Sequence, residues 1–243
     1  MTKFFKVQLR TTDVSAARAF YAEVLGHDAL DVVPLHASAL ARGARPHWLG
    51  YLEVDDVDRA SLAFTLRGAV ALGPAWVDET GLRAATMRDP GGAIVALAKP
   101  PPTGVASTGP EAQSKLLLHT RDVELSKASY REVAGWAFGA PIELAEHGVF
   151  HPFAWEPGGE TVGHLCDVAS RTGVHPHWQF RLPVSDVAAA TEAARAAGGL
   201  VAVVVTLATG ERIAVCDDPQ GAAFSCVEPA PRSGSSGAAL RGG

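Results

Sequence analysis

The order of apolar and polar residues predicts a strand and then a helix at the start of the chain. Residues 5–10 alternate between apolar and polar side chains, the period-two pattern of a strand with two different faces. Asp13 follows as a candidate helix N-cap, because its carboxylate can accept from unpaired backbone N–H groups. Ala16, Phe20 and Val24 then recur every four residues, which predicts one apolar stripe of an amphipathic helix.

The next stretch repeats this order and adds further strands. Asp56 is the second candidate N-cap, and Val57, Ala60 and Phe64 form the stripe of a second amphipathic helix. After this helix we expect three strands, at residues 69–77, 83–87 and 93–98. The first hundred residues therefore predict helices followed by groups of strands.

The second half of the chain repeats the first at a nearly fixed spacing. His47-Trp48 recurs as His177-Trp178, an offset of 130 residues. The turn Asp89-Pro90-Gly91-Gly92 recurs as Asp218-Pro219-Gln220-Gly221, an offset of 129 residues. A fixed internal period is the signature of a repeated architecture, so we expect the two halves to share one fold.

A weaker repeat precedes the first one. Asp13 and Tyr21 match Asp122 and Tyr130 at a constant offset of 109 residues. The offsets of 109 and 130 imply that the first half lacks roughly twenty residues between about positions 30 and 47. The chain is thus expected to contain four units in two pairs.

These units predict an α+β fold of four βαβββ units, arranged as two tandem modules with curved mixed sheets that form cups. Runs of proline, glycine and serine disfavour packed elements and mark the boundaries. We expect a first module at residues 1–99, a Pro-rich linker at 100–114, a second module at 115–229 and a disordered tail at 230–243.

Composition narrows the class of protein. The 243 residues are 47% hydrophobic, enough to bury a core, and the net charge of −5 gives no reason to expect nucleic acid or a membrane surface as partner. We find no signal peptide and no apolar run of membrane-spanning length, so we expect a cytoplasmic protein. Cys166, Cys216 and Cys226 are odd in number and lack zinc spacing, which favours reduced thiols.

The motifs together resemble the vicinal oxygen chelate superfamily, which includes glyoxalase I, bleomycin-resistance proteins and extradiol dioxygenases. The segment from Asp13 to Gly26 is similar to the family's opening helix. Val54-Asp55-Asp56-Val57 and the two Asp-Pro-x-Gly turns, at Asp89 and at Asp218, resemble its second-unit signature. The resemblance covers nearly all of residues 3–229 and implies a glyoxalase-like fold.

The resemblance also implies where metal ligands would lie. The corresponding positions hold Lys6, Leu49 and Ala96 in the first half, and Lys115, Gln179 and Ser225 in the second. A protonated lysine, a leucine and an alanine offer no lone pair to a cation, and the second set is also too poor. We therefore expect no metal at the family's site and no cofactor, with a divalent metal held by other residues as a less favoured alternative.

Strand parity suggests what lines the first cup. Residues two apart in a strand share a face, so the inward residues should be Lys6, Gln8 and Arg10 opposite Leu49, Tyr51 and Glu53. Two interpretations remain open. Lys6 or Arg10 pairs with Glu53 and closes the cavity, or these side chains form a cationic pocket for an anionic or hydroxylated aromatic ligand.

The second half offers the better pocket. By the same parity, its inward residues should be Lys115, Leu117 and His119 opposite Gln179, Arg181 and Pro183, with Ser225 on the last strand. Lys115 and Arg181 have no acid at the facing positions. We therefore expect an anionic ligand to bind here.

Histidines are concentrated in the second half. His175 and His177 share one face of an extended segment, so a metal site with His151 or His164 is conceivable. The favoured interpretation is that His177 marks the start of a strand, because His177-Trp178 echoes His47-Trp48. No Cys/His dyad spacing or phosphate-binding loop is apparent in the sequence.

Three functional hypotheses follow. The first is a metal-independent protein that binds a small organic molecule, as the family's bleomycin-resistance proteins do. The alternative is a glyoxalase-type lyase or a dioxygenase with relocated metal ligands, or a metal-free acid–base catalyst that uses His119 or Tyr51. The third is a scaffold with filled cavities. The sequence leaves open a monomer or a homodimer, and whether each cup forms from consecutive or exchanged units.

Overall fold

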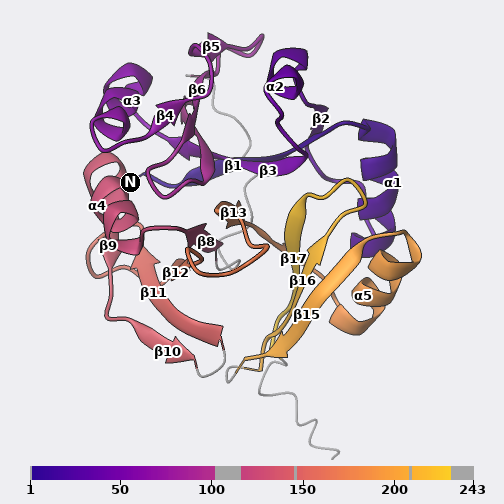
Figure 1. Cartoon of the computed structure of the whole chain (residues 1–243). Coiled ribbons are helices and arrows are strands. Elements are labelled where there is room, and N and C mark those ends of the chain that lie inside the picture. Colours follow the sequence, from indigo (N-terminus) through magenta and orange to yellow (C-terminus); the bar gives the residue numbers. More distant parts are fainter. Residues whose placement is uncertain (1, 102–115, 145–146, 208–209, 231–243) are drawn as a thin grey trace, which may run out of the picture.

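The computed structural model describes residues 2–101, 116–144, 147–207 and 210–230 (Figure 1). Most of the predicted linker, Lys115 and nearly all of the predicted tail lie outside these ranges.

The first half forms one continuous curved sheet with three helices. Its elements are β1 (Phe4–Thr11), α1 (Val14–Leu25), β2 (Val32–Pro34), α2 (Ala37–Ala41), β3 (His47–Glu53), α3 (Val57–Thr65), β4 (Val70–Ala71), β5 (Trp76–Val77), β6 (Arg83–Arg88) and β7 (Ile94–Lys99). The strand order is β2-β1-β3-β7-β6-β4, with β5 also paired to β6. Because β1 pairs with β3, consecutive units share the sheet.

The second half repeats this arrangement in two adjoining sheets. Its elements are β8 (Leu116–Thr120), α4 (Val123–Ala134), β9 (Ala137–Phe138), β10 (Ile142–Leu144), β11 (Gly148–Ala154), β12 (Gly163–Asp167), β13 (His177–Gln179), β14 (Arg181–Pro183), α5 (Val187–Ala196), β15 (Leu200–Thr206), β16 (Arg212–Asp217) and β17 (Ala223–Glu228). The strand orders are β10-β11-β12-β8-β13, with β9 paired to β11, and β14-β17-β16-β15. Only Phe180 separates β13 from β14, so these two strands together correspond to β3.

The predicted α+β fold of repeated units and curved mixed sheets is confirmed. The four major helices begin at the predicted N-caps, Asp13, Asp56, Asp122 and Asp186, each of which accepts from backbone N–H groups of the first turn. The predicted stripe of the first helix is partly wrong. Ala16 is exposed, and Ala17 and Tyr21 are buried beside Phe20 and Val24, because the buried face is rotated by one residue.

The first unit is shorter than the others, as the offsets of the repeat suggested. After α1 it places only β2 in the sheet, parallel to β1. In the third unit the corresponding parallel partner of β8 is β12, which is preceded by β9, β10 and β11. The first half therefore lacks the wall that β10 and β11 add to the second.

The two halves pack back to back on one core. Val7, Leu9 and Leu52 of the first sheet belong to the same buried cluster as Leu118 and Phe224 of the second half. Figure 1 shows β1 and β3 above β8 and β13, with the remaining strands curving away from this centre. In each half the other sheet face is directed away from this core, and we call these faces the first and the second cup. In the first half this face carries a second buried cluster, which includes Leu49, Tyr51 and Ala96.

One close approach between the halves requires a glycine. A Cβ on Gly50 would lie 2.6 Å from Cζ of Phe180 and 2.7 Å from a ring carbon of Phe4. Phe4 also contacts Trp178 at a centroid separation of 5.0 Å, and Phe180 at 5.6 Å, both edge to face. The N-terminal strand therefore contributes an aromatic side chain to the core of the second half.

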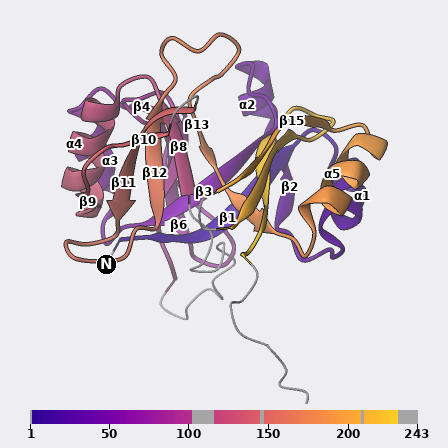
Figure 2. The same ribbon diagram turned by 90° about the horizontal axis from the view of Figure 1, so that it is seen from below.

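The helices pair across the halves. Helix α1 packs on α5, and α3 packs on α4, at the two sides of the molecule (Figures 1 and 2). The first and fourth units are thereby joined on one side, and the second and third units on the other. Among the described residues, no helix is long and apolar enough to cross a membrane.

Candidate functional site

The polar residues of the first cup pair with one another. Lys6 Nζ forms an ion pair with Asp31 Oδ2 at 2.9 Å, and Gln8 donates to the same carboxylate at 3.0 Å. The Tyr51 hydroxyl donates to Gln8 Oε1 at 2.8 Å and accepts from Arg10 Nη2 at 2.7 Å. These four predicted site residues therefore do meet on one face as a hydrogen-bonded network, in which Arg10 Nε is buried without a partner.

One detail of the sequence interpretation is wrong here. The described ion pairs join Lys6 to Asp31 rather than to Glu53, because the segment before β2 places Asp31 over the floor of the cup. Tyr51 is 1% exposed, and its hydroxyl both donates and accepts within the network. Its role as a catalyst stays a prediction.

Strand register shows which residues lie at the centre of the second cup, which we call its floor. Residues opposite one another in register lie on the same face of a sheet, and Leu117 lies opposite Gln179. Arg181 lies opposite Ser225, and Val215 lies opposite Ser225 on the other side. The register thus places Arg181 and Ser225 on one face of their sheet, and Gln179 with Leu117 on one face of the adjoining sheet. Lys115 lies outside the described residues.

The walls of the second cup are apolar and partly exposed. On one side the register places Ile142 and Phe150 on the cup face, with Ile142 44% exposed. On the other side it places Val203 and Val205 there, with Val203 42% exposed. A polar floor between two apolar walls matches the usual lining of a small-molecule site.

Arg181 is the cation of this floor. Its Nη1 is buried and has no hydrogen-bond partner in the described structure. Burial lowers the pKa of Arg181, while the charge of Glu211 opposes this shift. An unpaired buried donor costs free energy, so an acceptor brought by a ligand or by solvent would stabilise Nη1.

His119 lies on the same floor and is held by three neighbours. Its Nε2 lies 3.3 Å from Gln179 Oε1, its Nδ1 lies 3.3 Å from Cys166 Sγ, and its ring stacks on His177 at 4.4 Å. Because an amide oxygen only accepts, Nε2 carries the proton and Nδ1 accepts from the thiol.

Burial changes the acid–base character of this group. It lowers the pKa of His119 to about 4 and raises the pKa of Cys166 to about 11. The pKa of His119 thus lies below that of an ordinary histidine, because the imidazole is desolvated. At neutral pH the pair is an uncharged imidazole and an uncharged thiol, a weak base beside a weak nucleophile.

The residues at the family's metal positions do not suit a divalent cation. In the first cup these are an ion-paired Lys6, a leucine and an alanine. In the second cup Gln179 accepts from His119, and Ser225 is 1% exposed opposite Arg181. Neither set supplies the cluster of deprotonated donors that Zn²⁺, Mn²⁺ or Fe²⁺ takes.

The alternative histidine site is not assembled either. Within the described ranges, no three His, Cys, Asp or Glu side chains gather as a set that could hold a metal ion. His151 is influenced by the charges of Lys127 and Glu124 on α4. His164 lies instead on the cup face, opposite Leu117, with its ring 6.3 Å from Phe150.

Three contributors to the cups were missed from the sequence. Asp31 lies in a connection between elements, where no periodicity indicates its direction. Cys166 reaches His119 because β12 runs parallel to β8, a pairing that only the fold reveals. His177 was assigned to a strand start or to a metal site and not to the cup, although its spacing of two from Gln179 places both on one face.

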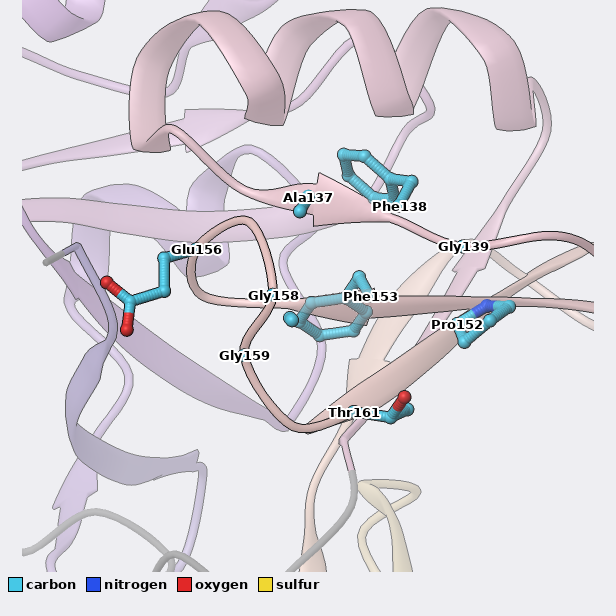
Figure 3. A pocket seen from close by; sticks show the side chains of 10 residues that line it. Ala137, Phe138, Gly139, Pro152, Phe153, Glu156, Gly158, Gly159 and Thr161 are labelled. Carbon is cyan, nitrogen blue, oxygen red and sulfur yellow. The ribbon is translucent and has the colours of Figure 1, made fainter.

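A cavity of about 210 Å³ lies outside the cups, between β9, β11 and the turn after β11 (Figure 3). Phe138, Phe153 and Pro152 form much of its lining. Figure 3 shows the Glu156 carboxylate directed away from these rings. Few polar groups converge on this cavity, so it is a weaker candidate site than the second cup.

Comparison with known proteins gives a consistent family. No family model matches the chain. A protein from Mycobacterium bovis named "Putative glyoxylase CFP32" is 31% identical over 252 residues, covering 93% of this chain and 94% of that protein. A protein of the same name from Mycobacterium tuberculosis has the same identity and coverage.

Solved structures share the fold at low identity. The 2,3-dioxygenase LapB from Pseudomonas sp. KL28 is 12% identical, with a TM-score of 0.59 over 94% of this chain and 92% of that one. The Mn(II)-bound glyoxalase from Novosphingobium aromaticivorans is also 12% identical, with a TM-score of 0.57 over 95% and 84%. Together with the relationship to the mycobacterial proteins, the repeated units and the paired cups establish that this chain belongs to the glyoxalase-like family of the vicinal oxygen chelate superfamily.

Proposed function

We propose that this protein binds a small organic anion with an apolar or aromatic body in the second cup, without a metal at the family's ligand positions. The observation that carries the proposal is Arg181, a cation whose buried Nη1 lacks a partner on a floor flanked by apolar strands. A carboxylate is the natural acceptor for a guanidinium, because the two planar groups can form paired hydrogen bonds.

The contrast between the cups supports this choice. In the first cup the charge of Lys6 is neutralised by Asp31, and Tyr51 bonds both Gln8 and Arg10. An incoming anion would have to break those contacts. In the second cup, Arg181 Nη1 has no hydrogen bond that a ligand would have to break. The exposed residues of β10 and β15 offer apolar surface for the body of the ligand.

The chemistry of the floor favours binding over catalysis. His119 has a pKa of about 4, so it is a poor base at neutral pH, and the Cys166 thiol keeps its proton. Gln179 and Ser225 are 2% and 1% exposed, so Arg181 is the polar group of the floor that a ligand would contact. A guanidinium beside apolar strands suits an aromatic acid, and we choose salicylate as the first probe.

Isothermal titration with salicylate and benzoate tests the proposal. Wild-type protein should bind an aromatic acid, and Arg181→Met should weaken binding at least tenfold because a charge-assisted pair is lost. The matched control is Arg10→Met, which removes a cation from the first cup. It should leave the affinity unchanged.

The outcomes are separable. Loss of affinity in Arg10→Met with retention in Arg181→Met would assign the ligand to the first cup and refute the proposal. Equal binding by both variants and by wild type would also refute it. Thermal unfolding of each variant without ligand shows whether a lost affinity reflects a lost fold.

A further inference from the structure

A second binding site is indicated where the two halves meet. The turns that open β3 and β13 have the same form, Arg45-Pro46-His47-Trp48 and His175-Pro176-His177-Trp178. These turns line a single cleft of about 570 Å³. Figure 2 shows α2, which precedes the first turn, on the same side of the molecule as the β12–β13 connection that contains the second. The volume lies within the usual range for small-molecule sites.

Each turn fixes its histidine in one tautomer. His47 Nδ1 lies 2.7 Å from the Arg45 carbonyl oxygen, and His177 Nδ1 lies 2.8 Å from the His175 carbonyl oxygen. A carbonyl oxygen only accepts, so each Nδ1 carries a proton and each neutral ring keeps its lone pair on Nε2. The cleft histidines therefore present hydrogen-bond acceptors on Nε2.

The second turn also forms part of a rigid wall. The His177 ring lies between two others, stacked on His119 at 4.4 Å and tilted against His175 at 4.8 Å. Burial lowers the pKa of His177 to about 3, and the charges of His119 and His175 act in the same direction. The His177 ring is consequently uncharged at neutral pH. The Nε2 of His177 is buried, which leaves His47 as the acceptor that a ligand would use.

The charge of the cleft comes from arginine. Arg45 of the first half and Arg121 of the second both line it, and both are exposed. Among the described lining residues there is no Asp or Glu. Two fixed positive charges without a lining counter-charge match a phosphate group, which carries a charge of about −1.5 to −2 at neutral pH.

We propose that this cleft binds a small phosphate ester bearing hydroxyl groups, with the phosphate at Arg45 and Arg121 and a hydroxyl donating to His47 Nε2. The site adjoins the second cup at His177 and takes residues from both halves. An arginine fork can bind phosphate oxygens in pairs. The neutral histidine adds selectivity for an organic phosphate over the bare ion, since it accepts from a hydroxyl group.

Calorimetric titration at pH 7 with ribose 5-phosphate, inorganic phosphate and ribose tests this assignment. Ribose 5-phosphate should bind more tightly than inorganic phosphate, and ribose should not bind. Arg45→Gln and Arg121→Gln should each weaken ribose 5-phosphate binding at least tenfold. Arg59→Gln, an exposed arginine on α3 outside the cleft lining, is the matched control and should have no effect.

A further variant tests the role of the histidine. His47→Phe keeps a planar ring but removes the acceptor, so it should weaken ribose 5-phosphate binding and leave inorganic phosphate binding unchanged. The proposal is overturned if neither phosphate probe binds to folded wild-type protein, or if Arg59→Gln weakens binding as much as the cleft variants. Arg181→Met should leave ribose 5-phosphate binding intact, which separates this site from the second cup.

Discussion

Removing the Tyr130 hydroxyl should destabilise the protein because it holds a buried charge between the halves. Tyr130 Oη donates to Asp89 Oδ2 at 2.8 Å and accepts from Trp178 Nε1 at 2.9 Å. Asp89 is 2% exposed. Tyr130→Phe loses one hydrogen bond to a charged group, worth about 1.5–3 kcal/mol, and one neutral bond, worth about 1 kcal/mol. We expect a loss of about 3 kcal/mol in the free energy of unfolding at pH 7.

The repeat supplies a matched control on the opposite side of the molecule. Tyr21 Oη donates to Asp218 Oδ2 at 3.3 Å and accepts from Trp48 Nε1 at 3.1 Å. Both contacts are longer than those of Tyr130, so Tyr21→Phe should cost only about 1–2 kcal/mol. We therefore predict that Tyr130→Phe is more destabilising than Tyr21→Phe, whatever the absolute free energies are.

The loss of unfolding free energy in Tyr130→Phe should also depend on pH. Burial raises the pKa of Asp89 from 3.8 to about 6, so its contribution to stability is greatest below pH 3.8 and is lost as the pH rises through 6. Without the Tyr130 donor, the ionised form is less favoured still. Urea unfolding, followed by tryptophan fluorescence, measures the free energy of unfolding. The difference in this free energy between wild type and Tyr130→Phe should therefore be larger at pH 8 than at pH 5. Equal costs for both tyrosines, or a cost independent of pH, would refute this reasoning.

Three further predictions concern Asp89, His119 and two glycines with positive φ. Asp89→Asn should reduce the loss of unfolding free energy between pH 5 and pH 7.5 by about 1.4 kcal/mol, and an unchanged slope in urea titrations would contradict the raised pKa. The His119 imidazole should titrate near pH 4 by NMR, and a midpoint near 6.5 would mean that it is not desolvated. Gly92→Ala should cost about 3 kcal/mol, because φ is +103° and a Cβ would meet a proline ring at 2.9 Å. Gly26→Ala, with φ of +74° and open space, should cost only about 1 kcal/mol by thermal unfolding.

The sequence predicted the fold well because local signals and the repeat agreed. N-caps such as Asp122 and Asp186 fix where helices begin, and strand alternation assigns residues to faces. The rotated face of α1 escaped prediction because two adjacent residues, Ala16 and Ala17, fit the apolar stripe equally well by composition.

The site was only half predictable. Parity placed Leu117 opposite Gln179, and the register confirms this pairing. It could not place Asp31, whose direction is set by a connecting segment, nor Cys166, whose neighbour is chosen by parallel strand pairing. The pKa of His119 was also inaccessible, because desolvation depends on tertiary packing rather than on spacing.

Titration of salicylate into protein treated with EDTA tests the central claim most directly. We predict that the dissociation constant equals that of untreated protein, since Arg181 rather than a metal supplies the positive charge. Binding that disappears with the chelator and returns on addition of Mn²⁺ or Zn²⁺ would contradict a metal-independent second cup.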